Sequence, residues 1–258
     1  MDNIFKKNIN KFRHSLRLSS LIFTKRIHNK EFIIVTGTDS SHYKSLKQLL
    51  SSIHLHEPFT KTIVFDLGMT LLERNKLKNR FKEIEIRSFN YSKYPEYFNV
   101  NINAGEYAWK PVIIIEILNE YRCSVCWMDA GNVITSPLSI IKKIMNLVGF
   151  YSPYSSGRIS EWTHPKTLKF IGISKKLLSK QNLNGACIAI NYKNNNVRNV
   201  VYKWEKCALE KKCIAPEGSN RNNHRQDQAT LSVLAHKFKI VNTIFSKYYG
   251  FKIHQDID

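Results

Sequence analysis

The chain has 258 residues, of which 43% are hydrophobic and 12% aromatic. This composition excludes intrinsic disorder, because disordered chains combine high charge with few aromatic residues. The contents of 10 glycines and 7 prolines exclude collagen-like and low-complexity proteins. The 40 lysine and arginine residues exceed the 20 acidic residues, which gives a net charge of +20. We expect one globular domain at residues 31–258, preceded by a distinct segment at residues 1–30.

The positive charge attracts polyanions such as nucleic acid, anionic lipid and phosphate-bearing substrates. It is concentrated in residues 1–30, where helical spacing would align four apolar side chains on one face: Phe5, Ile9, Phe12 and Leu16. Such a basic amphipathic segment either lies in a membrane interface or packs on the protein's own core. No apolar run approaches the roughly 18–20 residues of a membrane span. We therefore expect a cytoplasmic protein, peripheral to the inner face of a membrane.

From residue 31 onward, apolar runs that stop at polar residues or glycine alternate with amphipathic segments. Strands are expected at residues 31–37, 61–68, 83–89, 123–129, 149–153 and 184–191. Helices are expected at residues 40–53, 69–81, 111–121, 137–148, 171–178, 195–210 and 226–235. This alternation predicts an α/β fold with a mostly parallel, Rossmann-like central sheet flanked by helices.

Five cysteines are an odd number, which is unlike a disulfide framework. Cys123 and Cys126 have the spacing of a zinc-binding pair, but no second pair follows. A structural zinc site takes four ligands, so we interpret these two cysteines as buried thiols of a strand.

Polar residues follow the predicted strands at the points where the apolar runs end. In open parallel sheets, ligands bind beyond the carboxyl ends of the strands. The pattern therefore predicts a site for a polar, phosphorylated ligand, formed by Thr36, Gly37, Thr38, Asp39, Asp66, Gly68, Asp129, Gly131 and Asn132. Neither a glycine-rich dinucleotide motif nor a P-loop motif is present, which excludes the usual nucleotide-binding interpretations.

Several short motifs occur in a fixed order along the chain: Thr36-Gly-Thr-Asp39, Val64-Phe-Asp-Leu-Gly68, Tyr107-Ala-Trp-Lys-Pro111, Cys126-Trp-Met-Asp-Ala-Gly131, Asn184-Gly-Ala186 and His224-Arg-Gln-Asp-Gln228. Over about residues 31–236, this order resembles GT-A-type nucleotide-sugar glycosyltransferases. It is closest to a poorly characterised group with Asp-Leu-Gly, Tyr-x-Trp-Lys-Pro and Trp-x-Asp-x-Gly motifs. It is more distantly similar to glycosyltransferase family 8.

The resemblance implies a role for each matching position. The turn of Thr36, Gly37, Thr38 and Asp39 would hold the nucleotide base and ribose, and Lys110 would face the diphosphate. Other donor-binding positions would be Asp129, Gly131, Asn132 and Gly185. The catalytic residues would be Asp227, Gln228 and Asn184. Asp227 would serve as the base of an inverting reaction, or Asp227 and Gln228 with Asn184 would serve a retaining one.

Asp129 matches the first acid of an Asp-x-Asp motif, which in this fold binds the ribose and a divalent metal. The third position is Gly131, so the motif is incomplete. Two alternatives remain open. Either Mn²⁺ or Mg²⁺ binds with a second ligand from elsewhere, for which His224, Asp39, Asp66 and Asp227 are candidates. Or cations replace the metal, for which Lys110, Arg158, Arg221 and Arg225 are candidates.

The expected function is transfer of a sugar from a nucleotide-sugar donor to a glycan or lipid-linked acceptor, in the synthesis of a surface polysaccharide or glycoconjugate. Two other hypotheses come from different classes of protein. One is a catalytically inactive module that binds a nucleotide sugar or glycan. The other is a nucleic-acid-binding protein that uses the +20 charge, although no nucleic-acid motif accompanies that charge and no specific nucleic acid is expected.

Overall fold

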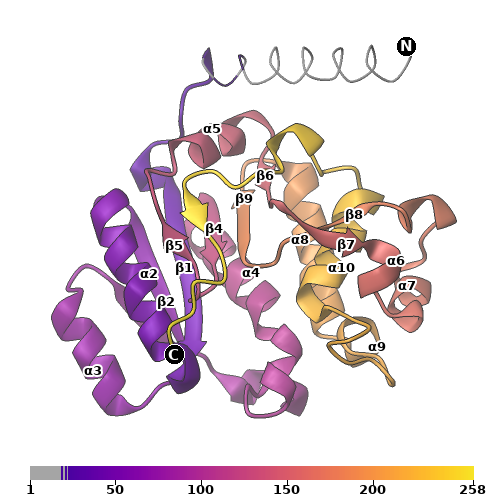
Figure 1. Cartoon of the computed structure of the whole chain (residues 1–258), viewed down its shortest axis with the longest axis horizontal. Helices are drawn as coiled ribbons and strands as arrows, with labels where there is room; N and C mark the ends of the chain where they lie inside the picture. Colours follow the sequence, from indigo (N-terminus) through magenta and orange to yellow (C-terminus); the bar gives the residue numbers. More distant parts are fainter. Residues whose placement is uncertain (1–18, 20, 22) are drawn as a thin grey trace.

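A central sheet of six strands organises the computed structural model, which describes residues 19, 21 and 23–258 (Figure 1). In spatial order the strands are β3 (Glu85–Ser88), β2 (Lys61–Gly68), β1 (Phe32–Asp39), β4 (Ser124–Met128), β9 (Cys187–Asn191) and β6 (Phe150–Tyr151). Strands β1, β2, β3 and β4 are parallel, whereas β9 runs antiparallel to both β4 and β6. The predicted α/β class with a mostly parallel sheet is confirmed.

Helices cover both faces of the sheet, as the alternation of segments predicts. One face carries α2 (Tyr43–His56), α3 (Leu71–Arg80) and α5 (Ser139–Leu147). The other carries α4 (Trp109–Tyr121), α8 (Asn195–Ala208) and α10 (Gln226–Lys237). Shorter helices are α6 (Ile159–Trp162), α7 (Pro165–Ile171) and α9 (Lys211–Ile214). Short strands outside the sheet are β5 (Val133–Ile134), β7 (Tyr154–Arg158), β8 (Gln181–Leu183) and β10 (Phe251–Lys252).

Strand β1 divides the core into two layers. Its side chains alternate, so that Ile33 and Val35 pack toward α4 and α8 while Phe32 and Ile34 pack toward α2 and α5. Because both faces of the strand are buried, its first four residues, Phe32 to Val35, are all apolar. This burial holds the carboxyl end of β1 in the middle of the molecule.

One predicted helix, at residues 171–178, is wrong. Helix α7 begins at Pro165, a residue suited to the first helical turn, and ends at Ile171. Gly172 follows with a φ of 68°, the left-handed conformation that commonly terminates helices. Residues 175–177 then form only a short 3₁₀ turn.

The cysteines differ in part from the expectation. Cys207 and Cys213 form a disulfide that joins α8 to α9, which the odd number of cysteines did not indicate. Cys123 and Cys126 are free and buried, as interpreted from the sequence. Among the described residues, no helix combines the length and apolar character needed to cross a bilayer.

The apolar stripe expected in residues 1–30 lies outside the described residues. The described part of this segment packs on α5: Leu21 and Ile27 are buried, and Lys143 Nζ donates to the Leu21 carbonyl at 2.8 Å. Leu21 and Ile27 are therefore part of the folded core.

A buried ion pair connects α5 to the loop after α2. Lys142, which is 2% exposed, contacts the Glu57 carboxylate, and Glu57 also accepts from the Leu138 backbone N–H at 2.7 Å. Thr60 donates to Glu57 at 2.6 Å. The carboxylate is thus held by one cation and two neutral donors.

Replacing Lys142 with methionine should lower the free energy of unfolding by about 3–5 kcal/mol, because a buried carboxylate without its cation is costly. Urea unfolding measures this loss. The double variant Glu57→Gln, Lys142→Met keeps an acceptor for Leu138 without the charge and should recover more than half of it. A single variant within about 1 kcal/mol of the wild type would contradict a stabilising role for the pair.

Candidate active site

A cavity of about 470 Å³ opens beyond the carboxyl ends of β1 and β4. Strand β2 pairs with one side of β1, and β4 pairs with the other side. The cavity therefore lies at a point where the strand order reverses direction, which is the usual ligand site of such sheets. Most of the predicted site residues line it: Gly37, Thr38, Asp39, Lys110, Asp129, Gly131, Asn132, Asn184, Gly185, Asp227 and Gln228. Segments far apart in sequence therefore converge on one site.

Thr36 and His224 do not line this cavity. Thr36 is fully buried in β1, next to the residues that do. His224 is 0% exposed, and both of its ring nitrogens have partners. Nδ1 accepts from the His164 N–H at 3.2 Å, and Nε2 lies 2.9 Å from the Ile214 carbonyl. His224 supports the loop before α10 and uses both ring nitrogens for that purpose. The expectation that it holds a metal therefore does not fit its position in the structure.

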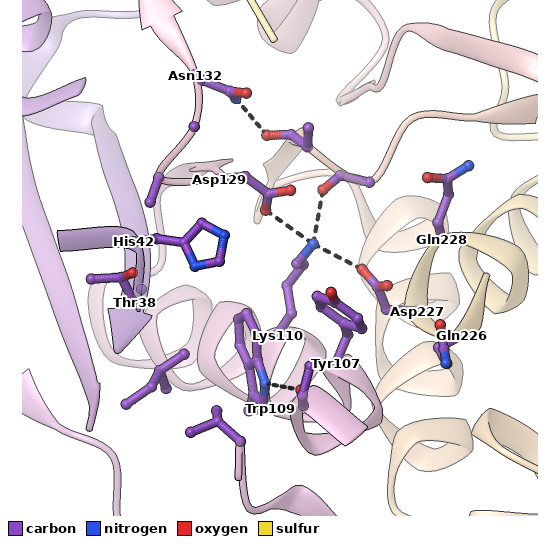
Figure 2. Close-up of a pocket in the computed structure, with 18 of the residues that line it drawn as sticks. Thr38, His42, Tyr107, Trp109, Lys110, Asp129, Asn132, Gln226, Asp227 and Gln228 are labelled. Atoms are coloured by element: carbon purple, nitrogen blue, oxygen red, sulfur yellow. Dashed lines mark hydrogen bonds and ion pairs between the residues drawn. The ribbon is translucent and has the colours of Figure 1, made fainter. Parts of the chain in front are cut away.

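The centre of the site is the ammonium group of Lys110, which is 2% exposed (Figure 2). Its Nζ lies 3.0 Å from Asp129 Oδ1 and 2.9 Å from Asp227 Oδ2, and it donates to the Gly185 carbonyl at 3.1 Å. The resemblance implies that this cation faces a donor diphosphate. In the structure its charge joins two acids from different elements.

The charges of this cluster depend on one another. Burial alone would lower the pKa of Lys110, but the carboxylates of Asp129 and Asp227 raise it well above its usual range, so the lysine is charged. Burial raises the pKa of Asp227 above the ordinary aspartate value, although Lys110 opposes this shift. A buried carboxyl with a raised pKa is a better proton acceptor than an exposed one.

Lys110 occupies the first turn of α4, where the helix dipole disfavours a cation. The two carboxylates offset that cost. The turn is positioned by η5 (Asn103–Tyr107), in which five consecutive residues have φ values from 48° to 63°. A Cβ at Gly105 would lie 2.3 Å from the Phe98 carbonyl, so this position requires glycine. Strained backbone of this kind is often found at functional sites.

Asp129 begins the tight turn after β4, which closes with a hydrogen bond from the Asn132 N–H to the Asp129 carbonyl at 3.0 Å. Trp127 Nε1 donates to Asp129 Oδ1 at 2.6 Å, which fixes the carboxylate. The Asp129 side chain remains 39% exposed. Its second oxygen therefore faces the cavity without a bond to any described residue.

The loop before β9 approaches α10 closely. A Cβ at Gly185 would lie 3.2 Å from Asp227 Oδ2, so the glycine allows the backbone to reach the acid. Asn184 Oδ1 accepts from the Ala186 N–H at 2.7 Å, and its amide nitrogen donates to Tyr248 at 3.2 Å. Asn184 thus shapes the loop that presents the Gly185 carbonyl to Lys110.

The end of β1 forms the opposite wall. Asp39 Oδ1 accepts from the Ser41 N–H at 3.0 Å and from the Ser41 hydroxyl at 2.6 Å. These bonds hold the turn that places His42 beside Thr38 at the cavity (Figure 2). Asp39 retains one oxygen for a ligand.

Two cations, Arg221 and Arg225, line the cavity near α10. Arg221 donates to the Tyr107 hydroxyl. The Arg225 guanidinium lies 4.1 Å from the Trp162 ring centroid, and its buried Nε has no partner among the described residues. Arg158, the fourth cation proposed from sequence, is not among the lining residues.

Sequence reasoning missed several residues of the cavity wall, among them His42, His254 and Asp256. His254 and Asp256 belong to the segment after β10, which passes the turn after β4 and ends beside the start of α2 (Figure 1). No motif marks this segment. The structure brings it to the site through the pairing of β10 with β5, in which Phe251 lies opposite Ile134.

The described residues include no group of three His, Cys, Asp or Glu side chains arranged to hold a metal. The cavity does offer oxygen atoms. Asn132 is 1% exposed, its Nδ2 donates to the Ala186 carbonyl at 2.7 Å, and its Oδ1 has no partner among the described residues. Buried polar atoms usually have a hydrogen-bond partner, so this amide oxygen is a candidate for binding a ligand or a metal ion.

The fold resembles that of GT-A glycosyltransferases. The family described as a protein of unknown function (DUF1647) matches residues 8–115. A crystal structure of the galactosyltransferase LgtC with donor and acceptor sugar analogs aligns with a TM-score of 0.52 and 18% identity, covering 78% of this chain and 70% of that one. The fold resemblance to GT-A glycosyltransferases, family 8 included, is thereby confirmed.

Two further structures show weaker similarity. Core-mannan synthase A from Aspergillus fumigatus, in a form with Mn and GDP, aligns with a TM-score of 0.48 and 8% identity, covering 80% of this chain and 69% of that one. The glycosyltransferase GlyE of Streptococcus pneumoniae aligns with a TM-score of 0.45 and 13% identity, covering 84% and 44%. Among curated proteins, none matches this chain.

The buried position of His224 predicts a pH dependence. Burial lowers the pKa of His224 from 6.5 to about 4, so between these values the unfolded chain binds a proton that the folded chain rejects. Stability is therefore present above pH 6.5 and falls by about 3 kcal/mol as the pH drops to 4. His224→Gln should flatten this part of the curve, measured by urea unfolding at several pH values. An unchanged slope would contradict the assignment.

Proposed function

We propose that this chain is a glycosyltransferase that moves a sugar from a nucleotide-sugar donor to a glycan or glycolipid acceptor. The observation that carries the proposal is the convergence of Asp129, Lys110 and Asp227 at the floor of a polar cavity in a GT-A-like fold. The cavity volume suits a ligand of this size, since small-molecule sites range from roughly 300 to 1,000 Å³.

The reaction breaks the bond between the anomeric carbon of the sugar and an oxygen of the diphosphate. The bonding electrons leave with the diphosphate, while the sugar gains oxocarbenium character. The acceptor hydroxyl forms the new bond and gives up its proton. The protein must therefore stabilise negative charge on one side and positive charge on the other.

Asp227 and Gln228 suit the positive side. Asp227 is buried at the start of α10, and its carboxylate oxygen would stabilise the sugar cation or accept the proton of the acceptor. Gln228 lines the same wall, and its buried Nε2 has no partner among the described residues. Lys110 holds the Asp227 carboxylate in place while the chemistry proceeds.

Arg221 and Arg225 suit the negative side. Both line the cavity, and a guanidinium binds phosphate oxygens in a bidentate manner. The residues present also fit a divalent cation, since Asp129 and Asn132 offer oxygen atoms of the kind that Mg²⁺ and Mn²⁺ prefer. When bound, such an ion would neutralise charge on the departing diphosphate.

For the acceptor, we propose a lipid-linked or membrane-associated glycan. The support is the basic, apolar-striped sequence of residues 1–18, which precedes the part that packs on α5. The proposed location is the cytoplasmic face of a membrane. The Cys207–Cys213 disulfide argues against a cytoplasmic location, because disulfides persist mainly in oxidising compartments.

Asp129→Asn and Asp227→Asn should each lower the rate of transfer at least about 100-fold, because each removes a charge that the reaction requires. Release of nucleotide from a panel of UDP-, GDP-, CMP- and dTDP-sugars with Mn²⁺ measures this effect. Lys110 keeps one carboxylate partner in each variant, so both should fold, as circular dichroism can verify.

Asp66→Asn is the matched control. Asp66 lies near the end of a strand as Asp129 does, but it accepts from the Gly68 N–H at 2.9 Å, pairs with Arg74 and does not line the cavity. Its activity should stay within about threefold of the wild type. If no donor is consumed by the wild type, the chain is a binding module and the enzymatic proposal fails.

Deleting residues 1–18 should abolish binding to phosphatidylglycerol vesicles while leaving the fold intact, since the packed segment begins at Leu21. Co-sedimentation at low and high salt measures the binding, which should weaken with salt. Phosphatidylcholine vesicles serve as the uncharged control. Equal binding by the full chain and the deletion would refute membrane attachment through this segment.

A further inference from the structure

The carboxylate of Asp256 occupies the space beside Gly131 that a side chain at position 131 would fill. A Cβ added to Gly131 would lie 2.2 Å from Asp256 Oδ1 and 2.6 Å from both Cγ and Oδ2. These are the three nearest atoms, and the backbone of Gly131 is not in the left-handed region. A larger residue at position 131 would have to displace the Asp256 side chain, whereas the backbone conformation of Gly131 does not itself require glycine.

The C-terminal segment, residues 251–258, is anchored on both sides of Asp256. Before it, β10 pairs with β5, and the Gln255 N–H donates to the Gly131 carbonyl at 2.8 Å. After it, the Ile257 N–H donates to the Ser45 hydroxyl at 3.0 Å, and Asp258 accepts from the Lys44 N–H at 2.7 Å. The hydrogen bonds of the residues on either side therefore hold Asp256 at the cavity.

The charge of Asp256 is not compensated by the protein. No described residue forms an ion pair or hydrogen bond with its carboxylate, although it lines the cavity together with Asp129. Around Lys110, one positive charge meets the two negative charges of Asp129 and Asp227, which leaves −1 when both acids are ionised. Asp256 adds a further carboxylate beside Gly131, and a divalent cation bound there would neutralise its negative charge.

The third feature is Asn132, which follows Gly131 directly. It is 1% exposed, lines the cavity, and keeps Oδ1 without a partner among the described residues. Mg²⁺ typically takes one or two carboxylates, waters and substrate phosphates, and Mn²⁺ suits the same oxygen ligands. Two carboxylates and an amide oxygen around one turn are a donor set of this kind.

We propose that Asp256 supplies, from the C-terminal segment, the second acid that Gly131 lacks, and that Asp256 and Asp129 bind a divalent cation together. The carboxylate missing at the third position of the Asp-x-Asp motif would thus be provided from a distant part of the sequence. The inference rests on the proposed function for the identity of the donor diphosphate, but cation binding is measured independently of transfer.

The experiment is electron paramagnetic resonance of MnCl₂ titrated into the full chain, alone and with UDP or GDP. The wild type should bind Mn²⁺, and Asp256→Asn should weaken the affinity at least about tenfold, since even second-shell substitutions typically cost 10–100-fold. Asp258→Asn is the matched control, because Asp258 lies in the same segment but contacts α2 instead of the cavity. Its affinity should stay within about twofold.

The double variant Gly131→Asp, Asp256→Gly moves the carboxylate to the motif position and removes its steric obstacle. It should recover Mn²⁺ affinity to within about threefold of the wild type. No binding by the wild type, or equal binding by Asp256→Asn, would overturn the inference. A wild type that binds Mn²⁺ through Asp256 but consumes no donor would sustain this inference and refute the proposed transferase activity.

Discussion

The site depends on one buried cation. Lys110 lies in a cavity floor that excludes most water, and its three nearest acceptors come from the turn after β4, the loop before β9 and the start of α10. An unpaired ammonium at this depth would be strongly unfavourable, so the lysine requires at least one carboxylate partner, and here it has two. Conversely, Asp227 and Asp129 can lie close together only because the positive charge of Lys110 offsets the repulsion between the two carboxylates. The lysine thus assembles the site and sets the charge available to a ligand.

The rest of the fold positions this lysine. The apolar strands β1 and β4 place two carboxyl ends side by side, and the left-handed turn η5 directs the first turn of α4 between them. On the other side, α10 delivers Asp227, while the C-terminal segment brings Asp256 over Gly131. The result is a cavity with Asp129 and Asp256 at one wall, and with Asp227 beside the two arginines at another.

Much of this arrangement follows from the sequence, for physical reasons. Uninterrupted apolar runs predict buried strands, and β2 falls at residues 61–68 as expected. Acids that end such runs, such as Asp129, gather at one sheet edge by topology alone. The contacts of Lys110 could not be predicted, because they depend on the packing of three separate segments. Neither could Asp256, since a two-residue strand such as β10 has no periodicity and gains its stability only from pairing with β5.

The central claim is that the cavity around Lys110 is shaped for a sugar diphosphate. The most direct measurement is the thermal unfolding temperature in a panel of UDP-, GDP-, CMP- and dTDP-sugars, with and without Mn²⁺, for the wild type and Lys110→Met. Ligands that bind only the folded state raise its stability by mass action. The account predicts a saturable rise with one nucleotide class and none for the lysine variant. A flat response to every nucleotide sugar, or an equal rise in Lys110→Met, would contradict it.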